Sequence, residues 1–335
     1  MMKLSFWGNN NSDEGLLNRE QSMDVLRIMA CVGVLFAHAG AMCISTGVVG
    51  KGEFGWDMCF VVKLMLKIFV PIFAMITGYF FLKPDRELTL KKLYGKNILR
   101  LAVALVFWTL FNALFIHSHF YPFGGPDTNF WYVGMCIGLY ISMPVLRAVA
   151  ADEKLLSFSC WTWIGIRCYY FIGEFVPVPI VITDYVFTDF VGYCLWGYYL
   201  FKMTLNRKQA RIVYFSGLIA LLATLLLPLL TNEEVSFRYA DPAPILAVFS
   251  IFLFAIRHPI KLSDKKGKIL AHFSKATFGI YMAHSFVVVE TFSRVYRFVP
   301  NPVALIPIST IVIFVMSYFI VLVIKQIPVL KNWVV

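Results

Sequence analysis

The chain has 335 residues, of which 59% are hydrophobic, 17% aromatic and 15% charged, with a formal net charge of +11 and a mean hydropathy of +0.74. Soluble domains are roughly one-quarter charged, so this composition excludes an ordinary soluble enzyme, and the aromatic content excludes a disordered chain. A basic excess on so apolar a protein orients it in a bilayer and attracts anionic headgroups, so we expect membrane lipids and no nucleic acid among its partners.

Ten apolar segments are long enough to cross a bilayer, which takes about 20 residues of helix. In chain order they are residues 24–46, 57–82, 93–117, 129–150, 156–174, 185–205, 210–230, 241–258, 270–294 and 302–325. The first twenty residues contain no apolar signal-peptide core, so we expect the first of these segments to remain as an anchor. The sequence therefore predicts an all-α polytopic membrane protein with about ten transmembrane helices in a single bundle.

The loops between these segments alternate in charge. Lys and Arg gather in every second loop, namely 83–92, 151–155, 203–209 and 259–269. Cytoplasmic loops of membrane proteins are enriched in Lys and Arg, so the alternation predicts both termini in the cytoplasm. The outer loops 118–128 and 174–184 contain Pro, and the first also Gly, so we expect them to form the mouth of a site.

One membrane domain is expected, because no internal repeat or flexible linker divides the chain. Residues 1–23 then form a short cytoplasmic N-terminal segment, 24–325 the transmembrane domain and 326–335 a cytoplasmic tail. The cysteines show neither a CxxC pair nor a ligand-like spacing to His, so we expect no metal and no permanently bound cofactor.

Among the ionisable residues inside the predicted spans, eight are the candidates for membrane depth: Arg27, His38, Lys63, Lys67, Arg167, Lys275, His284 and Glu290. Ionisable groups are costly in a bilayer and often mark functional sites. Lys63 and Lys275 lie near helix ends, where a long side chain can reach the interface. Arg167 and Glu290 can equally be explained by pairing with neighbouring charges.

Arg27 and His38 are eleven residues apart, which in a helix is three turns plus about 20°, so both lie on one stripe roughly 16 Å apart. Such a stripe suits an elongated anionic donor, such as a coenzyme A thioester, with its phosphates on Arg27 and its reactive end at the imidazole. A neutral His can there accept a proton from an attacking hydroxyl. Lys96 and Arg100 are neighbours on the third span and can grip phosphates beside Arg27, although an ordinary positive-inside flank explains them too.

Several segments resemble the membrane acyltransferase 3 family. Asp24-Val-Leu-Arg27, ten further residues and His38 resemble the family's opening helix, whose signature is an Arg, ten residues and a His. Further segments resemble the family's motifs in the same order along the chain. They are Lys67-Ile-Phe-Val-Pro71 with Thr77-Gly78-Tyr79, then Phe130-Trp131-Tyr132, Gly197-Tyr198-Tyr199-Leu200, and the stretch from Ser274 to Tyr281 and His284. The resemblance covers about residues 20 to 325, and the chain resembles the compact type, similar to the O-acetyltransferase that acts on enterobacterial common antigen. The chain departs from the family at Lys67 and Asn97, where Arg is usual.

This resemblance implies an O-acyltransferase of the bacterial cytoplasmic (inner) membrane. Its co-substrate would be cytoplasmic acyl-CoA, commonly acetyl-CoA, and its acceptor a hydroxyl of a surface polysaccharide or lipid-linked glycan. The implied catalytic residues are His38, as general base or acyl carrier, and Arg27, with Arg27, Lys96 and Arg100 binding the acyl-CoA. Acceptor-side or supporting residues would be Asp24, Lys67, Thr77, Trp131, Tyr132, Tyr281 and His284.

Two other functions fit the composition. A transporter or flippase for a lipid-linked sugar would line its pathway with the buried charges, but it would favour two related halves with paired, interrupted helices, and the sequence has none. A membrane sensor or scaffold without chemistry would leave Arg27 and His38 as packing residues. The acceptor, the acyl group and the oligomeric state remain open at this point.

Overall fold

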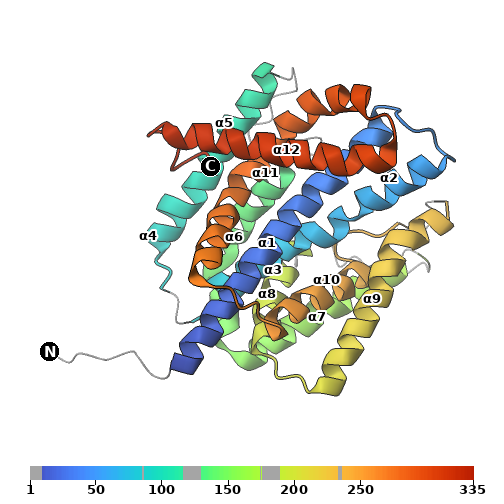
Figure 1. The fold of residues 1–335 in the computed structure, drawn as a ribbon. Coiled ribbons are helices and arrows are strands. Elements are labelled where there is room, and N and C mark those ends of the chain that lie inside the picture. The colour runs from blue at the N-terminus through green and yellow to red at the C-terminus, as the bar shows by residue number, and fades with distance from the viewer. Residues whose placement is uncertain (1–9, 85–86, 116–129, 174, 176–188, 233–235) are drawn as a thin grey trace.

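The structure is a computed structural model that describes residues 10–84, 87–115, 130–173, 175, 189–232 and 236–335. Within these ranges the chain forms helices joined by turns and contains no strand, so the predicted all-α fold is confirmed (Figure 1). Where the structure describes them, the ten predicted spans are mostly helical. The helices are α1 (Asn10–Ser45), α2 (Phe54–Leu64), α3 (Leu66–Phe81), α4 (Leu90–Lys92), η1 (Leu93–Ile98), α5 (Leu99–Phe115), α6 (Trp131–Ala151), α7 (Glu153–Gly173), α8 (Asp189–Lys202), α9 (Arg207–Leu230), α10 (Pro242–Arg257), α11 (Asp264–Phe298) and α12 (Pro302–Gln326).

Among the described residues, six stretches of helix are long and apolar enough to cross a membrane by length and composition. They are Glu20–Ser45, Gly55–Phe81, Leu90–Phe115, Trp131–Ala151, Arg207–Leu230 and Pro302–Gln326. Helices α8 and α10 are only 14 and 16 residues long. Large apolar side chains are exposed along α9 and α12, as expected of helices that face lipid. The protein is therefore a membrane protein, and the figure of ten crossings stays a prediction.

Helix α1 is the centre of the bundle and packs against α2, α3, α10, α11 and α12. It begins at Asn10, so the N-terminal segment is already helical well before residue 24, and its 36 residues make about 54 Å of helix. In Figure 1, α1 rises from the lower left, and α12 crosses the top of the view almost horizontally. A helix longer than the bilayer's apolar core, about 30 Å thick, projects beyond it.

The second predicted span, 57–82, is two helices, because the chain turns at Met65 between α2 and α3. Pro71 lies inside α3. Proline has no N–H, so it leaves the carbonyl of the residue four positions earlier, Lys67, without its helical partner and crowds it. The distortion that Pro71 causes therefore falls at Lys67, two residues after the break at Met65.

Helices α3 and α8 pack with their backbones in close contact. A methyl group added at Gly78 would overlap the carbonyl of Cys194, and one added at Gly197 would overlap the carbonyl of Met75. Small residues let membrane helices approach this closely. The two glycines therefore fix α3, and with it Lys67 and Thr77, against α8.

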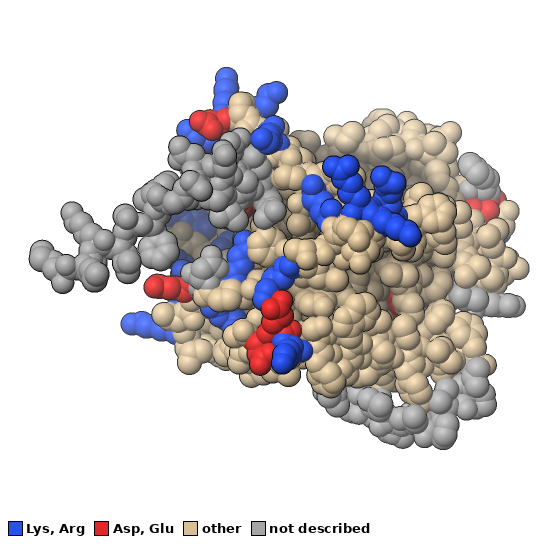
Figure 2. All heavy atoms as spheres, turned by 90° about the horizontal axis from the view of Figure 1, so that it is seen from below, with Lys and Arg blue, Asp and Glu red and all other residues tan. Residues whose placement is uncertain are grey.

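The loops predicted to be cytoplasmic lie at the ends of α3, α6, α8 and α10, on what we call the basic face. Figure 2 looks at the molecule from this side and shows Lys and Arg side chains spread over it, several of them around a recess at its left. The opposite ends of the helices carry the loops that were predicted to lie outside, and we call that end the outer face.

Candidate active site

A cavity of 680 Å³ lies between α1, α3, α5, α6, α11 and α12, close to the basic face. This volume is ordinary for a small-molecule or cofactor site. Five basic residues line the described part of its wall, and no Asp or Glu side chain does: Arg27, Lys92, Arg100, Lys275 and Lys325. Opposite charges attract strongly in such a partly desolvated cleft, so the cavity is built for an anion.

Arg27 is held on the cavity wall by a network with α11. Its Nη1 donates to Asp24 Oδ1 at 3.1 Å and to Ser274 Oγ at 2.9 Å, and the Ser274 hydroxyl donates to Asp24 Oδ1 at 2.5 Å. Both contacts of the guanidinium use Nη1, which leaves Nη2 and Nε without a partner among the described residues. Arg27 is thus oriented by protein groups and keeps donors for a ligand.

Arg100 is engaged by the C-terminal segment. Its Nη2 donates to the backbone oxygen of Val335 at 2.5 Å, while Trp108 Nε1 donates to the carbonyl of Val334 at 3.1 Å. Val334 and Val335 are buried, and Val335 forms part of the cavity wall. The segment predicted as a simple cytoplasmic tail therefore folds back onto the bundle, because its two apolar valines find a buried place there.

Lys96 does not line the large cavity. It lies in the wide π-helical turn η1, is exposed, and borders a smaller cavity with Arg100 and residues 331–333. The π turn shifts the helical register, and Lys92 and Asn97 reach the large cavity instead. Of the three predicted donor-binding residues, the structure brings Arg27 and Arg100 together and places Lys96 beside them on a separate wall.

His38 and His284 form an imidazole pair, with ring centres 5.1 Å apart and a tilt of 39°. Both Arg27 and His38 meet α11, at Ser274 and His284 respectively, so the predicted stripe on α1 exists and faces one neighbour. His284 is fully buried, and its Nδ1 donates to the carbonyl of Tyr281. Neither histidine is on the wall of the cavity, which ends at Tyr281 next to them.

A row of aromatic rings connects the imidazole pair to the outer face. The Tyr281 ring lies 5.2 Å from His284 and 5.9 Å from Tyr132. Trp131 follows at 5.9 Å from Tyr132 and 5.4 Å from Tyr239. Tyr132 and Tyr281 also line the cavity, so they form the boundary between the cationic cavity and the outer aromatic rings.

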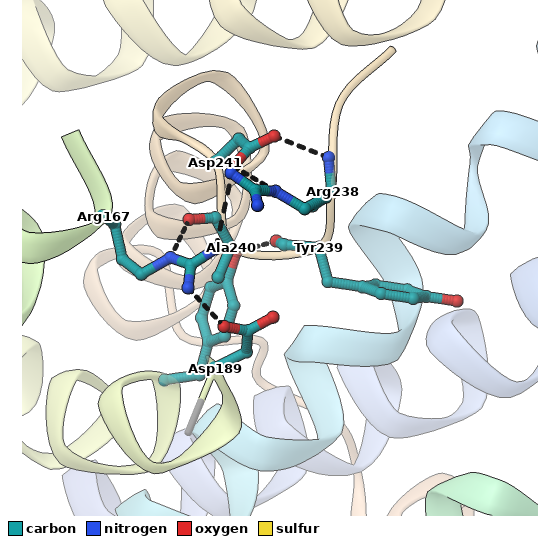
Figure 3. Close-up of polar contacts among 7 residues, drawn as sticks. Arg167, Asp189, Arg238, Tyr239, Ala240 and Asp241 are labelled. Carbon is teal, nitrogen blue, oxygen red and sulfur yellow. Dashed lines mark hydrogen bonds and ion pairs between the residues drawn. The ribbon is translucent and has the colours of Figure 1, made fainter. Parts of the chain in front are cut away.

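A buried ion network holds the last ring of this row in place (Figure 3). Arg167, which is 2% exposed, contacts Asp189 at 2.7 Å and Asp241 at 3.7 Å, and its Nε donates to the carbonyl of Ala240 at 2.8 Å. Arg238 closes the network through its contact with Asp241 at 3.3 Å. Of the two explanations left open for Arg167, pairing with neighbouring charges is the one seen in the structure. The network pins the residues just before α10.

Tyr239 points away from these charges (Figure 3). The Lys67 ammonium lies over its ring, 4.4 Å from the ring centre. Burial raises the pKa of the Tyr239 phenol to about 12, so the ring is neutral at physiological pH and the contact is a cation–π interaction. Lys67 and Trp131 thus meet at Tyr239, between the aromatic row and the outer face.

The remaining predicted residues take structural or border positions. Thr77 lines the cavity, and its Oγ1 donates to the carbonyl of Phe73 at 2.9 Å. Glu290 pairs with Arg294 at 3.2 Å, which is one of the two explanations left open for it. The two predicted mouth loops lie, apart from residue 175, outside the described residues.

Sequence reasoning missed three cations of the cavity, Lys92, Lys275 and Lys325. Lys275 was explained as an interfacial lysine, yet its side chain lines the cavity, one residue after Ser274. Lys325, near the end of α12, is the last residue of the predicted span 302–325 and was assigned no role, yet it also lines the cavity. The available signal was the position of Lys275 beside Ser274 in a segment already noted for its resemblance to a family.

A family model described as an acyltransferase domain matches residues 20–325, which is most of the chain. The chain belongs to the acyltransferase 3 family. No curated protein and no solved structure matches it. As a member of this family, the protein is a membrane acyltransferase.

The geometry of this acyltransferase separates two functions in space. A cavity of cations at the basic face can hold an anionic carrier, and aromatic rings near the outer face can stack against a sugar. The imidazole pair lies between them, next to Tyr281. An imidazole at that place can exchange a proton or carry an acyl group.

Proposed function

We propose that the protein is an O-acyltransferase of the bacterial cytoplasmic (inner) membrane that moves an acetyl group from acyl-CoA to a hydroxyl of a surface polysaccharide or lipid-linked glycan. The observation that carries the proposal is the cavity whose described wall holds five basic side chains and no Asp or Glu side chain, and which ends beside the imidazole pair. The family supplies the acyl transfer, and the cavity supports the choice of donor.

The donor enters from the basic face, which is the cytoplasmic face in this proposal. Its phosphates contact Arg27 and Arg100, with Lys92, Lys275 and Lys325 adding positive charge around them. Arg is suited to phosphate because its planar fork donates two parallel hydrogen bonds. The flexible arm then runs along the apolar wall toward Tyr132 and Tyr281, and the thioester passes Tyr281 to reach His38.

The acceptor glycan approaches from the outer face. Trp131 and Tyr239 offer ring faces against which a sugar can stack, and Lys67 adds a cation beside them. The acceptor hydroxyl reaches the imidazole pair past Tyr132. Only the acyl group crosses the membrane in this arrangement, and neither polar substrate has to leave water completely.

Acyl transfer needs a group that removes the proton of the hydroxyl or that carries the acyl group between the two substrates, and His38 serves this need in the proposal. The test is the release of coenzyme A by purified protein in lipid nanodiscs supplied with acetyl-CoA and a glycolipid extract of the cell envelope. We expect release and transfer of the acetyl group by the native protein, and neither by His38→Ala.

His272→Ala is the matched control, because His272 lies on the exposed side of α11 and bonds the Tyr318 hydroxyl at 2.8 Å, away from the cavity wall. This variant should transfer the acetyl group normally. A His38→Ala protein that elutes as folded and still transfers the group would refute the role of His38. Native protein that moves a lipid-linked sugar between leaflets without releasing coenzyme A would instead identify a transporter.

A further inference from the structure

The His284 side chain has a basic nitrogen that no group uses. Its Nδ1 lies against the carbonyl oxygen of Tyr281, and a carbonyl oxygen can only accept a hydrogen bond. Nδ1 therefore carries the ring proton of the neutral imidazole, and Nε2 carries a lone pair. Among the described residues Nε2 has no hydrogen-bond partner, although His284 is 0% exposed.

A buried polar atom without a partner is unfavourable by about 1–3 kcal/mol and needs an explanation. A histidine retained only for packing would be expected to use both nitrogens or to be replaced by an apolar side chain. Here the backbone orients the ring, and the His284 ring lies between two other rings, with its centre 5.1 Å from that of His38 and 5.2 Å from that of Tyr281. The arrangement presents one defined lone pair to a molecule that reaches the His284 ring.

The two histidines differ in how they are held. The His284 ring is fixed by the Tyr281 carbonyl, whereas His38 contacts His284 and makes no hydrogen bond with any other described residue. A base works best when its orientation is fixed. A carrier needs a free nitrogen and space for the group that it accepts, and His38 is also less deeply buried than His284.

On the basis of the proposed function, we propose that His38 carries the acyl group covalently and that His284 Nε2 is the base that activates the acceptor hydroxyl. In the first step a His38 nitrogen attacks the thioester carbonyl, the C–S bond breaks, and the thiolate leaves with the proton lost from the His38 ring as the free thiol. In the second step the acceptor oxygen attacks the acyl carbon while His284 takes the hydroxyl proton. The C–N bond to His38 breaks, and His284 returns the proton to the His38 ring.

The division of roles between His38 and His284 also fits the place of the two rings between the cationic cavity and the aromatic row. The cationic cavity meets the pair at Tyr281, and the aromatic row meets it through Tyr132 and the same Tyr281. A covalent carrier lets the two substrates occupy the space next to the pair one after the other. A single displacement would require the thioester and the glycan hydroxyl to be there together.

The experiment is a rapid-quench reaction of the purified protein with acetyl-CoA labelled in the acetyl group, first without acceptor and then with a glycolipid extract added. Native protein is expected to release one equivalent of coenzyme A, to retain the label, and to lose it when the acceptor is added. His284→Asn can still donate to the Tyr281 carbonyl through its amide but has no base. We expect it to become labelled to the same extent and to discharge the label at least a hundredfold more slowly.

His38→Ala is expected to acquire no label, and peptide mapping of the native protein should place the acetyl group on His38. Mapping needs no variant, so it decides the matter even if a His284 variant fails to fold. A label on another residue, or transfer by native protein with no labelled state, would overturn the carrier role. Discharge by folded His284→Asn at the native rate would overturn the base role.

These failures are distinct from failure of the proposed function. If His38→Ala is inactive while His284→Asn transfers normally, only the inference about His284 falls. If the native protein releases no coenzyme A from acetyl-CoA under any condition, the proposed donor is wrong, and the two-step route falls with it.

Discussion

Replacing Arg27 by Lys tests whether the cavity binds the phosphates of the donor. Arg27 has five N–H donors, and the two contacts to Asp24 and Ser274 use Nη1. A Lys keeps the positive charge but has a single nitrogen. It cannot hold Asp24 and Ser274 and also make a forked contact to phosphate.

The magnitude follows from the lost contact. A hydrogen bond to a charged group contributes about 1.5–3 kcal/mol, and 1.4 kcal/mol is a tenfold change in affinity. Loss of one such bond in Arg27→Lys should therefore weaken coenzyme A binding roughly tenfold to about a hundredfold. The same substitution should barely change the binding of pantetheine, which has the arm of coenzyme A but not its phosphates.

The assay is calorimetric titration of purified protein with coenzyme A and with pantetheine. The matched control is Arg294→Lys, because Arg294 pairs with Glu290 and is 68% exposed, remote from the cavity wall. The control should bind both ligands like the native protein. An unchanged dissociation constant for coenzyme A in Arg27→Lys, or an equal loss for both ligands, would refute phosphate binding by Arg27.

Other substitutions test the packing and the acceptor side. Gly78→Ala should abolish the folded peak in size-exclusion chromatography, because its methyl group overlaps the α8 backbone, whereas Gly95→Ala, where no atom lies within 4 Å, should leave it unchanged. Arg167→Leu should destabilise the protein by about 3–5 kcal/mol by leaving Asp241, which is 0% exposed, with one partner fewer, and thermal unfolding in detergent would show this. Trp131→Ala should slow glycan acylation without changing the dissociation constant for coenzyme A, and an equal loss of both would contradict an acceptor role.

The parts that the sequence could predict are those that depend on local periodicity. The predicted spans are mostly helical where the structure describes them, because apolar length alone decides it, and the stripe of Arg27 and His38 exists because α1 is one continuous helix. The break at Met65 was not predicted, because the residues around it are as apolar as the rest of the span. Pro71, which lies six residues later inside α3, is of a type common in membrane helices and gives no sign of a break at Met65.

Contacts between residues distant in sequence could not be derived in the same way. Nothing in the residues around His38 and His284 specifies that their rings meet, since this depends on how α1 packs against α11. The burial of Val335 against Arg100 likewise requires the end of the chain to fold back. Lys275 was assigned to the interface because a single sequence shows its depth but not the direction of its side chain.

The most direct test of the account is a mass comparison of surface glycans and glycolipids from cells that produce the native protein, His38→Ala, or neither. The account predicts a glycan carrying the added mass of one acetyl group in cells with the native protein, and its absence in the other two. Identical glycan masses in all three, with the native protein folded in the membrane, would contradict it.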